Sequence, residues 1–122
     1  MPVDRRPQHR LFDVEVVQLD GTAAMMLRGE LDVATAPELE ERARELAAQV
    51  PPTAEMVLDF SQLEFIDAAG LAVIARLGEE LRARGGGLRI ESARPLTCRI
   101  FEITGLACLL RRPAVAETTS EP

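Results

Sequence analysis

The chain has 122 residues, of which 47% are hydrophobic and 28% charged, and its formal net charge is −6. This length fits one domain with a core of its own and is too short for two typical domains. All 14 basic residues are arginine and none of them gather into a concentrated basic surface, which argues against a nucleic-acid backbone as partner.

The N-terminal residues Met1–Arg10 hold two prolines and three arginines without periodicity, so we expect a flexible arm there. They lack the apolar block of a secretory signal, and no apolar run in the chain approaches the roughly 18 residues that span a bilayer. We therefore expect a cytoplasmic protein that does not insert into a membrane.

An antiparallel pair of strands is predicted next. Apolar and acidic residues alternate over Phe12–Val16, which is typical of a half-buried strand, and Asp20-Gly21 is a hairpin turn signal. A second strand is expected at about Ala23–Arg28.

A surface helix follows. Thr35 and Glu38 have the spacing of a capping box, and Pro37 is tolerated in the first turn, where its missing N–H costs nothing. Pro51-Pro52 ends the helix. Its apolar face is predicted to comprise Leu39, Ala43, Leu46, Ala47 and Val50.

The run Met56–Phe60 is apolar on both faces, which favours a central parallel strand covered by crossover helices. It continues through Phe65-Ile66 to Asp67, and Ala68-Ala69-Gly70 then open a second helix. Such a strand-to-helix turn leaves backbone N–H groups facing outward, where they suit an anion or the close approach of a partner's backbone. Taken alone, the same residues favour a tight strand-to-helix connection, so the case for a binding site depends on the rest of the chain.

The second helix is predicted to end at Gly85-Gly86-Gly87 and to be followed by a strand over Leu88–Glu91. Pro95 begins a third helix, with Gly105 as its end signal, and residues 107–110 are a candidate edge strand. The third helix is predicted to carry one apolar face, formed by Leu96, Ile100 and Ile103.

These elements predict an α/β fold with a mostly parallel sheet of four to five strands, an antiparallel N-terminal pair, and three to four helices packed on the sheet. The domain should cover residues 11–112, between the arm of residues 1–10 and a disordered tail over 113–122.

The sequence predicts no enzyme, cofactor or metal site. The only histidine, His9, lies in the arm, and the turn at Asp67 offers one carboxylate with no base, nucleophile or metal ligand beside it. Cys98 and Cys108 are expected to be buried inert thiols, with a redox gate as the alternative. An intramolecular bridge between them looks awkward, because about 9 Å of helix follows Cys98 before the chain reaches Cys108.

Four strings occur in the order and spacing of one known family: GELDVATAPEL, LDFSQLEFIDAAGL, GGGLRI and ARPLTCRIFEITGL. Together they closely resemble the STAS domain family, in particular the bacterial anti-sigma-factor antagonists. The similarity covers about Phe12 to Leu110.

The resemblance implies a protein-binding switch in transcription regulation. Antagonists of this family bind an anti-sigma factor that is also a serine kinase, which frees a sigma factor. The kinase then phosphorylates a hydroxyl in a turn that typically reads Asp-Ser-Ser/Thr-Gly. Asp67, Ala68, Ala69 and Gly70 match that turn, with Ala69 at the acceptor position.

Ala69 has no hydroxyl, so the family's phosphorylation cannot occur at this position. We expect a form that stays competent to bind, because the added charge of −1.5 to −2 that would disrupt docking cannot be installed. Other hydroxyl groups are less suited as phosphorylation sites. Ser61 is interpreted as a turn residue and Thr35 as a helix cap. The hydroxyl groups of residues 118–120 lie in the tail, remote from the contact surface.

The resemblance places a docking surface around this turn. The structural alternative for Asp32 is a solvated loop acid, and that for Asp67 is a residue that caps the helix. The predicted surface comprises Asp32, Val33, Thr35, Asp67, Ala68, Ala69, Gly70, Ala72, Val73 and Arg76.

The alternative function is an accessory STAS subunit of a transport or stress-signalling complex. The sequence leaves the oligomeric state open.

Overall fold

The computed structural model describes residues 12–19 and 22–110. Four strands and three α-helices alternate along most of this chain, and a short 3-10 helix closes it. In chain order the elements are β1 (Phe12–Leu19), β2 (Thr22–Leu31), α2 (Ala36–Ala47), β3 (Glu55–Ile66), α3 (Ala68–Ala83), β4 (Gly87–Glu91), α4 (Pro95–Ile103) and η1 (Ala107–Leu109).

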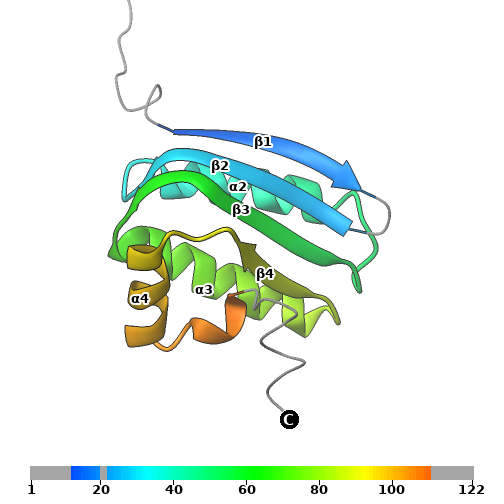
Figure 1. Cartoon of the computed structure of the whole chain (residues 1–122). Coiled ribbons are helices and arrows are strands. Elements are labelled where there is room, and N and C mark those ends of the chain that lie inside the picture. The colour runs from blue at the N-terminus through cyan, green and yellow to red at the C-terminus, as the bar shows by residue number, and fades with distance from the viewer. Residues whose placement is uncertain (1–11, 20–21, 111–122) are drawn as a thin grey trace, which may run out of the picture.

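The strands form one mixed sheet in the order β1-β2-β3-β4 (Figure 1). β1 and β2 are antiparallel, and β2, β3 and β4 run parallel to one another. The predicted α/β fold with an antiparallel N-terminal pair is confirmed, with four strands. The Asp20-Gly21 turn lies outside the described residues, as do the N-terminal arm and the C-terminal tail.

The helices cover only one face of the sheet, and the core lies between the two layers (Figure 1). β2–α2–β3 and β3–α3–β4 both step to the neighbouring strand in the same direction, so crossovers of one hand place α2 and α3 on the same side. β3 is central and parallel to both neighbours, as its apolar run predicts, and α2 and α3 cover its core-facing side. Its core-facing residues Met56, Leu58 and Phe60 are nearly inaccessible, at 1% exposure or less.

β3 is longer than its neighbour β4. β4 ends at Glu91, opposite Asp59, whereas β3 continues to Ile66 alongside β2 and shifts register twice on the way. The last residues of β2 and β3 therefore project together beyond β4, and the candidate site forms at this end of the sheet.

α3 ends as its glycines predict. Gly85 adopts φ +99°, a left-handed conformation that suits glycine, and the Gly86 N–H donates to the Leu81 carbonyl at 2.9 Å. This is a Schellman-type C-cap, which satisfies carbonyl groups at the end of the helix.

Two predictions for the C-terminal part are wrong. α4 buries Phe101, whose ring meets Phe60 edge-on at 6.0 Å, while Leu96 and Ile103 are 72% and 79% exposed. Residues 107–110 do not form an edge strand: a 3-10 helix occupies most of them, and only Leu110 makes a single parallel bridge, to Ile90.

Candidate partner-binding site

The turn from β3 into α3 is held by Asp67. Its backbone is extended (φ −112°, ψ −172°), and its side chain accepts a hydrogen bond from the Gly70 N–H at 3.0 Å. Asp67 therefore caps α3, which is the structural alternative that the sequence left open. The cap engages Gly70 N–H, and helix geometry leaves the amides of Ala68 and Ala69 directed out of the first turn.

Gly70 sits where no side chain fits. A Cβ atom built on it would lie 2.8 Å from both the Cγ atom and the carbonyl oxygen of Leu31, and 2.9 Å from Cγ1 of Ile66. The first turn of α3 thus packs directly on the ends of β2 and β3, which brings the turn close against the sheet.

The loop after β2 is organised by Asp32 and Thr35. The Asp32 carboxylate accepts hydrogen bonds from the amides of Ala34 (3.0 Å) and Thr35 (3.1 Å). The Thr35 hydroxyl donates to the Glu30 carbonyl at 2.8 Å and accepts from the Asp32 N–H at 2.9 Å. This closed network turns Val33 outward, where it is 73% exposed.

The network replaces the predicted capping box. Thr35 is the N-cap residue of α2 by position, but its side chain makes no cap hydrogen bond. The hydroxyl is instead drawn back to Glu30 and Asp32, because Thr35 is only 3% exposed and its polar atom must find partners inside the loop. Asp32 is likewise no free loop acid, since its carboxylate holds two amides. Pro37 does lie in the first turn, as predicted.

The two segments are joined by one backbone hydrogen bond. The Asp67 N–H donates to the Leu31 carbonyl at 3.1 Å, just before the loop that presents Val33. The loop after β2 and the turn after β3 therefore lie at the same end of the sheet, where α2 and α3 begin (Figure 1). Both segments contribute residues to the docking surface that the resemblance implies.

Burial divides the predicted docking surface into three groups. Val33, Ala68, Ala72 and Arg76 are exposed, and Asp32, Asp67 and Ala69 are half-buried. Thr35, Gly70 and Val73 are buried, so they support the surface from beneath and offer a partner almost no area. Val73 faces the core because it lies on the same side of α3 as Ile74 and Leu77.

Two exposed apolar residues at this end of the sheet do not belong to the surface predicted from the sequence. Phe65, next to the last residue of β3, is 51% exposed, and Leu96, in the first turn of α4, is 72% exposed. In the sequence, Phe65 forms an apolar pair with Ile66, and the register shift after Gly29 turns it outward. Gly29 adopts φ +98°, and a glycine inside a strand is the one local signal of such an irregularity. The helical spacing of Leu96, Ile100 and Ile103 predicts an inner position for Leu96, whereas the structure places it outside.

The cysteines are free thiols. Cys98 is half-buried, with its thiol 3.6 Å from the Ala93 carbonyl, and Cys108 is exposed. The prediction that both are buried is therefore wrong.

Comparison with known proteins decides the family. The model of the STAS domain matches residues 13–121, which is nearly the whole chain. The chain belongs to the STAS domain family. The mixed four-stranded sheet with its helices on one face is the fold of this STAS domain.

Several relatives of this STAS domain are named anti-sigma factor antagonists. It is 30% identical to the anti-sigma-B factor antagonist of Bacillus subtilis (strain 168), over 87% of this chain and 94% of that protein. It is 36% identical to the putative anti-sigma factor antagonist BtrV of Bordetella bronchiseptica, over 72% and 74% of the two chains. The crystal structure of an anti-sigma factor antagonist from Mycobacterium paratuberculosis superposes with a TM-score of 0.72 at 30% identity, covering 89% of this chain and 92% of that one.

These relatives are binding proteins rather than enzymes, which agrees with the expectation of a non-enzymatic protein. Within residues 12–19 and 22–110, no helix is long and apolar enough to cross a membrane. In the same ranges, no group of three His, Cys, Asp or Glu side chains is placed to hold a metal ion.

Proposed function

We propose that this STAS domain is an anti-sigma-factor antagonist that binds a kinase-type anti-sigma factor and thereby releases a sigma factor. The proposal extends to this chain the role named for its relatives. The observation that carries it is the corner at Asp67–Gly70, where small residues open a helix at the end of the sheet beside an outward-facing Val33.

The contact surface comprises the exposed members of the predicted set, above all Val33, Ala68, Ala72 and Arg76. Apolar side chains that are held outward by a rigid loop or helix lose little conformational entropy on binding, so they suit a docking surface. Asp67 and Asp32 fix the backbone of the two segments through their own hydrogen bonds.

Regulation is proposed to differ from the pattern that the resemblance implies. A phosphoryl group needs an acceptor hydroxyl, and Ala69 carries only a methyl group. The half-buried Ala69 lies two residues from the Asp67 carboxylate, where a phosphate would add like charge to the contact surface. Without that step the antagonist stays in its binding-competent form.

The test combines the purified protein, its cognate anti-sigma factor and radiolabelled ATP. We expect a stable complex and no label at residues 67–70. Absence of a complex would refute the antagonist role, and label within 67–70 would refute the proposed loss of regulation. Ala72→Arg, which places a bulky charge on an exposed helix position, should weaken the complex while leaving the folded structure intact.

The substitution Ala69→Ser restores an acceptor and is the matching gain of function. We expect the kinase to incorporate label into this variant, and the complex to dissociate as the label accumulates. Ala68→Ser adds the same hydroxyl one residue earlier and serves as the matched control, for which we expect no phosphorylation. Equal labelling of the two variants would contradict a dedicated acceptor position.

A further inference from the structure

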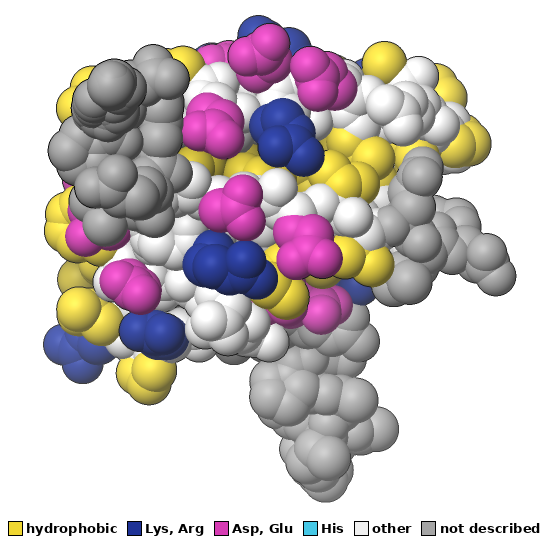
Figure 2. All heavy atoms as spheres, turned by 90° about the horizontal axis from the view of Figure 1, so that it is seen from above, with side chains coloured by type: hydrophobic (Ala, Val, Ile, Leu, Met, Phe, Trp, Pro, Cys, Tyr) yellow, Lys and Arg dark blue, Asp and Glu magenta, His cyan; other side chains and the backbone are white. Residues whose placement is uncertain are grey.

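The face of the sheet opposite the helices is uncovered among the described residues, and its composition differs from that of the candidate site. Figure 2 looks onto this face and shows acidic and arginine side chains around a hydrophobic strip. Alternate residues of β2 define it: Ala23, Met25 and Leu27 point into the core, so Ala24, Met26 and Arg28 point to the open face.

Strand register arranges this face in rows. One row runs across the sheet from Val17 through Ala24 and Val57 to Arg89 and is largely apolar. A hollow of about 420 Å³ lies over it, lined by side chains from all four strands. The adjoining row contains three carboxylates around one apolar residue, namely Glu15, Met26, Asp59 and Glu91.

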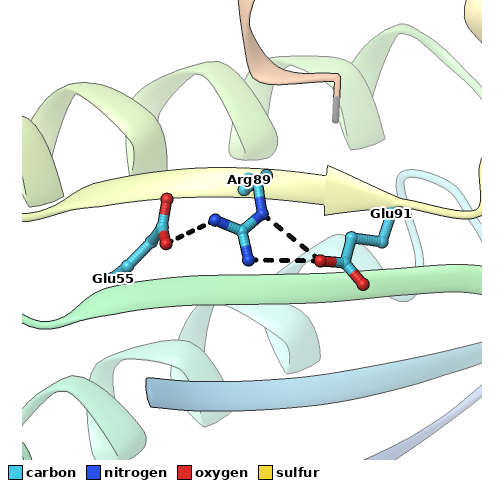
Figure 3. A network of polar contacts seen from close by, with 3 residues as sticks. All are labelled: Glu55, Arg89 and Glu91. Carbon is cyan, nitrogen blue, oxygen red and sulfur yellow. Dashed lines mark hydrogen bonds and ion pairs between the residues drawn. The ribbon is translucent and has the colours of Figure 1, made fainter. Parts of the chain in front are cut away.

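Both arginines of the face are already engaged, each with two carboxylates. Arg28 pairs with Asp13 at 3.3 Å and with Glu15 at 3.6 Å. Arg89 lies between Glu55 and Glu91 and pairs with both (Figure 3).

The open face therefore keeps an excess of negative charge. Over residues 13–17, 22–28, 55–59 and 87–91 it carries five carboxylates against two guanidinium groups. Asp59 lines the hollow and accepts the Ser61 N–H at 2.8 Å. A cationic segment with apolar side chains would complement both rows, since like-charged faces of two copies would repel.

The sequence holds one such segment directly before β1. Residues 1–11 contain Arg5, Arg6 and Arg10 against the single acid Asp4, together with Val3 and Leu11. They enter β1, the edge strand of this sheet, at Phe12. Eleven extended residues reach about 36 Å, whereas the four strands are only about 14 Å across, so the segment is long enough to cross the face.

We propose that the open face of the sheet is the binding site of the chain's own basic N-terminal segment, residues 1–11. The arginines meet the carboxylate row, and the apolar residues of the segment shield the hollow over Val17, Ala24 and Val57. The contact joins largely exposed charges, so it is weak, screened by salt and compatible with the flexible arm that the sequence predicts. It is independent of the proposed antagonist role.

The test attaches a spin label to the full chain at Val3→Cys, in a background with Cys98→Ala and Cys108→Ser. Paramagnetic broadening of amide signals then reports which residues the segment approaches. We expect broadening at Ala24, Met26 and Val57 at low salt, and its loss in about 0.5 M NaCl, where the Debye length is only a few ångströms.

Charge variants identify the contact. Arg5→Glu with Arg6→Glu should abolish the broadening, and so should Glu15→Gln with Asp59→Asn on the face. Glu41→Gln with Glu79→Gln removes the same charge from exposed positions on the helix layer and should leave the broadening unchanged.

Three results would overturn the proposal: broadening confined to the neighbours of Phe12, broadening over the helices, or broadening that salt does not change. A mixed sample identifies the source of the segment. If a spin-labelled chain broadens the same amides of a second, isotope-labelled chain, the segment binds between copies and the intramolecular assignment is wrong.

Discussion

At the scale of single residues, the candidate site contains three small residues, Ala68, Ala69 and Gly70, and each has a different structural role. Gly70 is required by packing, because a Cβ atom there would overlap Leu31 and Ile66. Ala68 is exposed, so its size keeps the surface open without serving the core. Ala69 is half-buried and marks the position where the resemblance places a hydroxyl. The sequence identified all three positions but could not distinguish packing from exposure.

Gly70→Ala should destabilise the fold by about 1–3 kcal/mol, since the new methyl group must displace backbone as well as side-chain atoms of β2. Gly78→Ala is the matched control on the same helix, because the atoms nearest to its Cβ would be side-chain atoms of Leu109 and Leu88, at 3.6 to 3.8 Å. There the gain in helix propensity, up to about 1 kcal/mol, should make the change neutral or stabilising. Urea unfolding followed by circular dichroism measures both, and equal effects would contradict the packing argument.

At the scale of elements, α4 shows how tertiary contacts override an apparent pattern. A helix of nine residues is not stable alone, so its packing decides which face is buried. Phe101 meets Phe60 edge-on in the core, and this contact leaves Leu96 and Ile103 outside. The sequence predicted the helix and its bounds closely but selected the wrong inner face, because Leu96, Ile100 and Ile103 also follow a helical spacing.

Phe101→Ala should cost about 3–5 kcal/mol, because it removes a fully buried ring and the Phe60 contact. Phe101→Leu keeps most of the side-chain volume, so it should lower the free energy of unfolding clearly less than Phe101→Ala does. It can be compared with Ile103→Ala even if Phe101→Ala fails to fold. Ile103→Ala, at a position 79% exposed, should change the free energy of unfolding by less than about 0.5 kcal/mol. A larger loss from Ile103→Ala than from Phe101→Leu would show that α4 packs by its other face.

At the scale of the whole molecule, a single hydrophobic cluster joins the sheet to the helices. It includes residues from all four strands and from α2, α3 and α4, among them Phe12, Leu39, Leu58, Ile74 and Phe101. No element has a separate core of its own within this set, so the described part of the chain should fold as one unit.

Unfolding in urea should therefore be a single transition. Circular dichroism, which reports the helices, and amide NMR signals of β1, which report the sheet edge, should give the same midpoint. A separate early transition of the α4 signals would show that this helix is a local unfolding unit, and the one-core description would then fail.

The sequence by itself determined the order of the elements, the antiparallel pair, the central strand and the position of the turn at Asp67. These follow from local signals, namely apolar periodicity, glycine and proline stops, and an acid before a helix, which act over a few residues. The absence of a hydroxyl at Ala69 is also a fact of the sequence alone.

Only the tertiary structure decided which residues at this end are available to a partner. The hydroxyl of Thr35 turned to the loop rather than the helix, Val73 and Gly70 were taken into the core, and Phe65 was turned outward by a shift in strand register. It also decided that no helix or strand among the described residues covers the face of the sheet opposite α2 and α3, where the charges lie in rows. These outcomes depend on contacts between segments distant in sequence, where packing and hydrogen bonding compete with local preference, and no short stretch of sequence records the result.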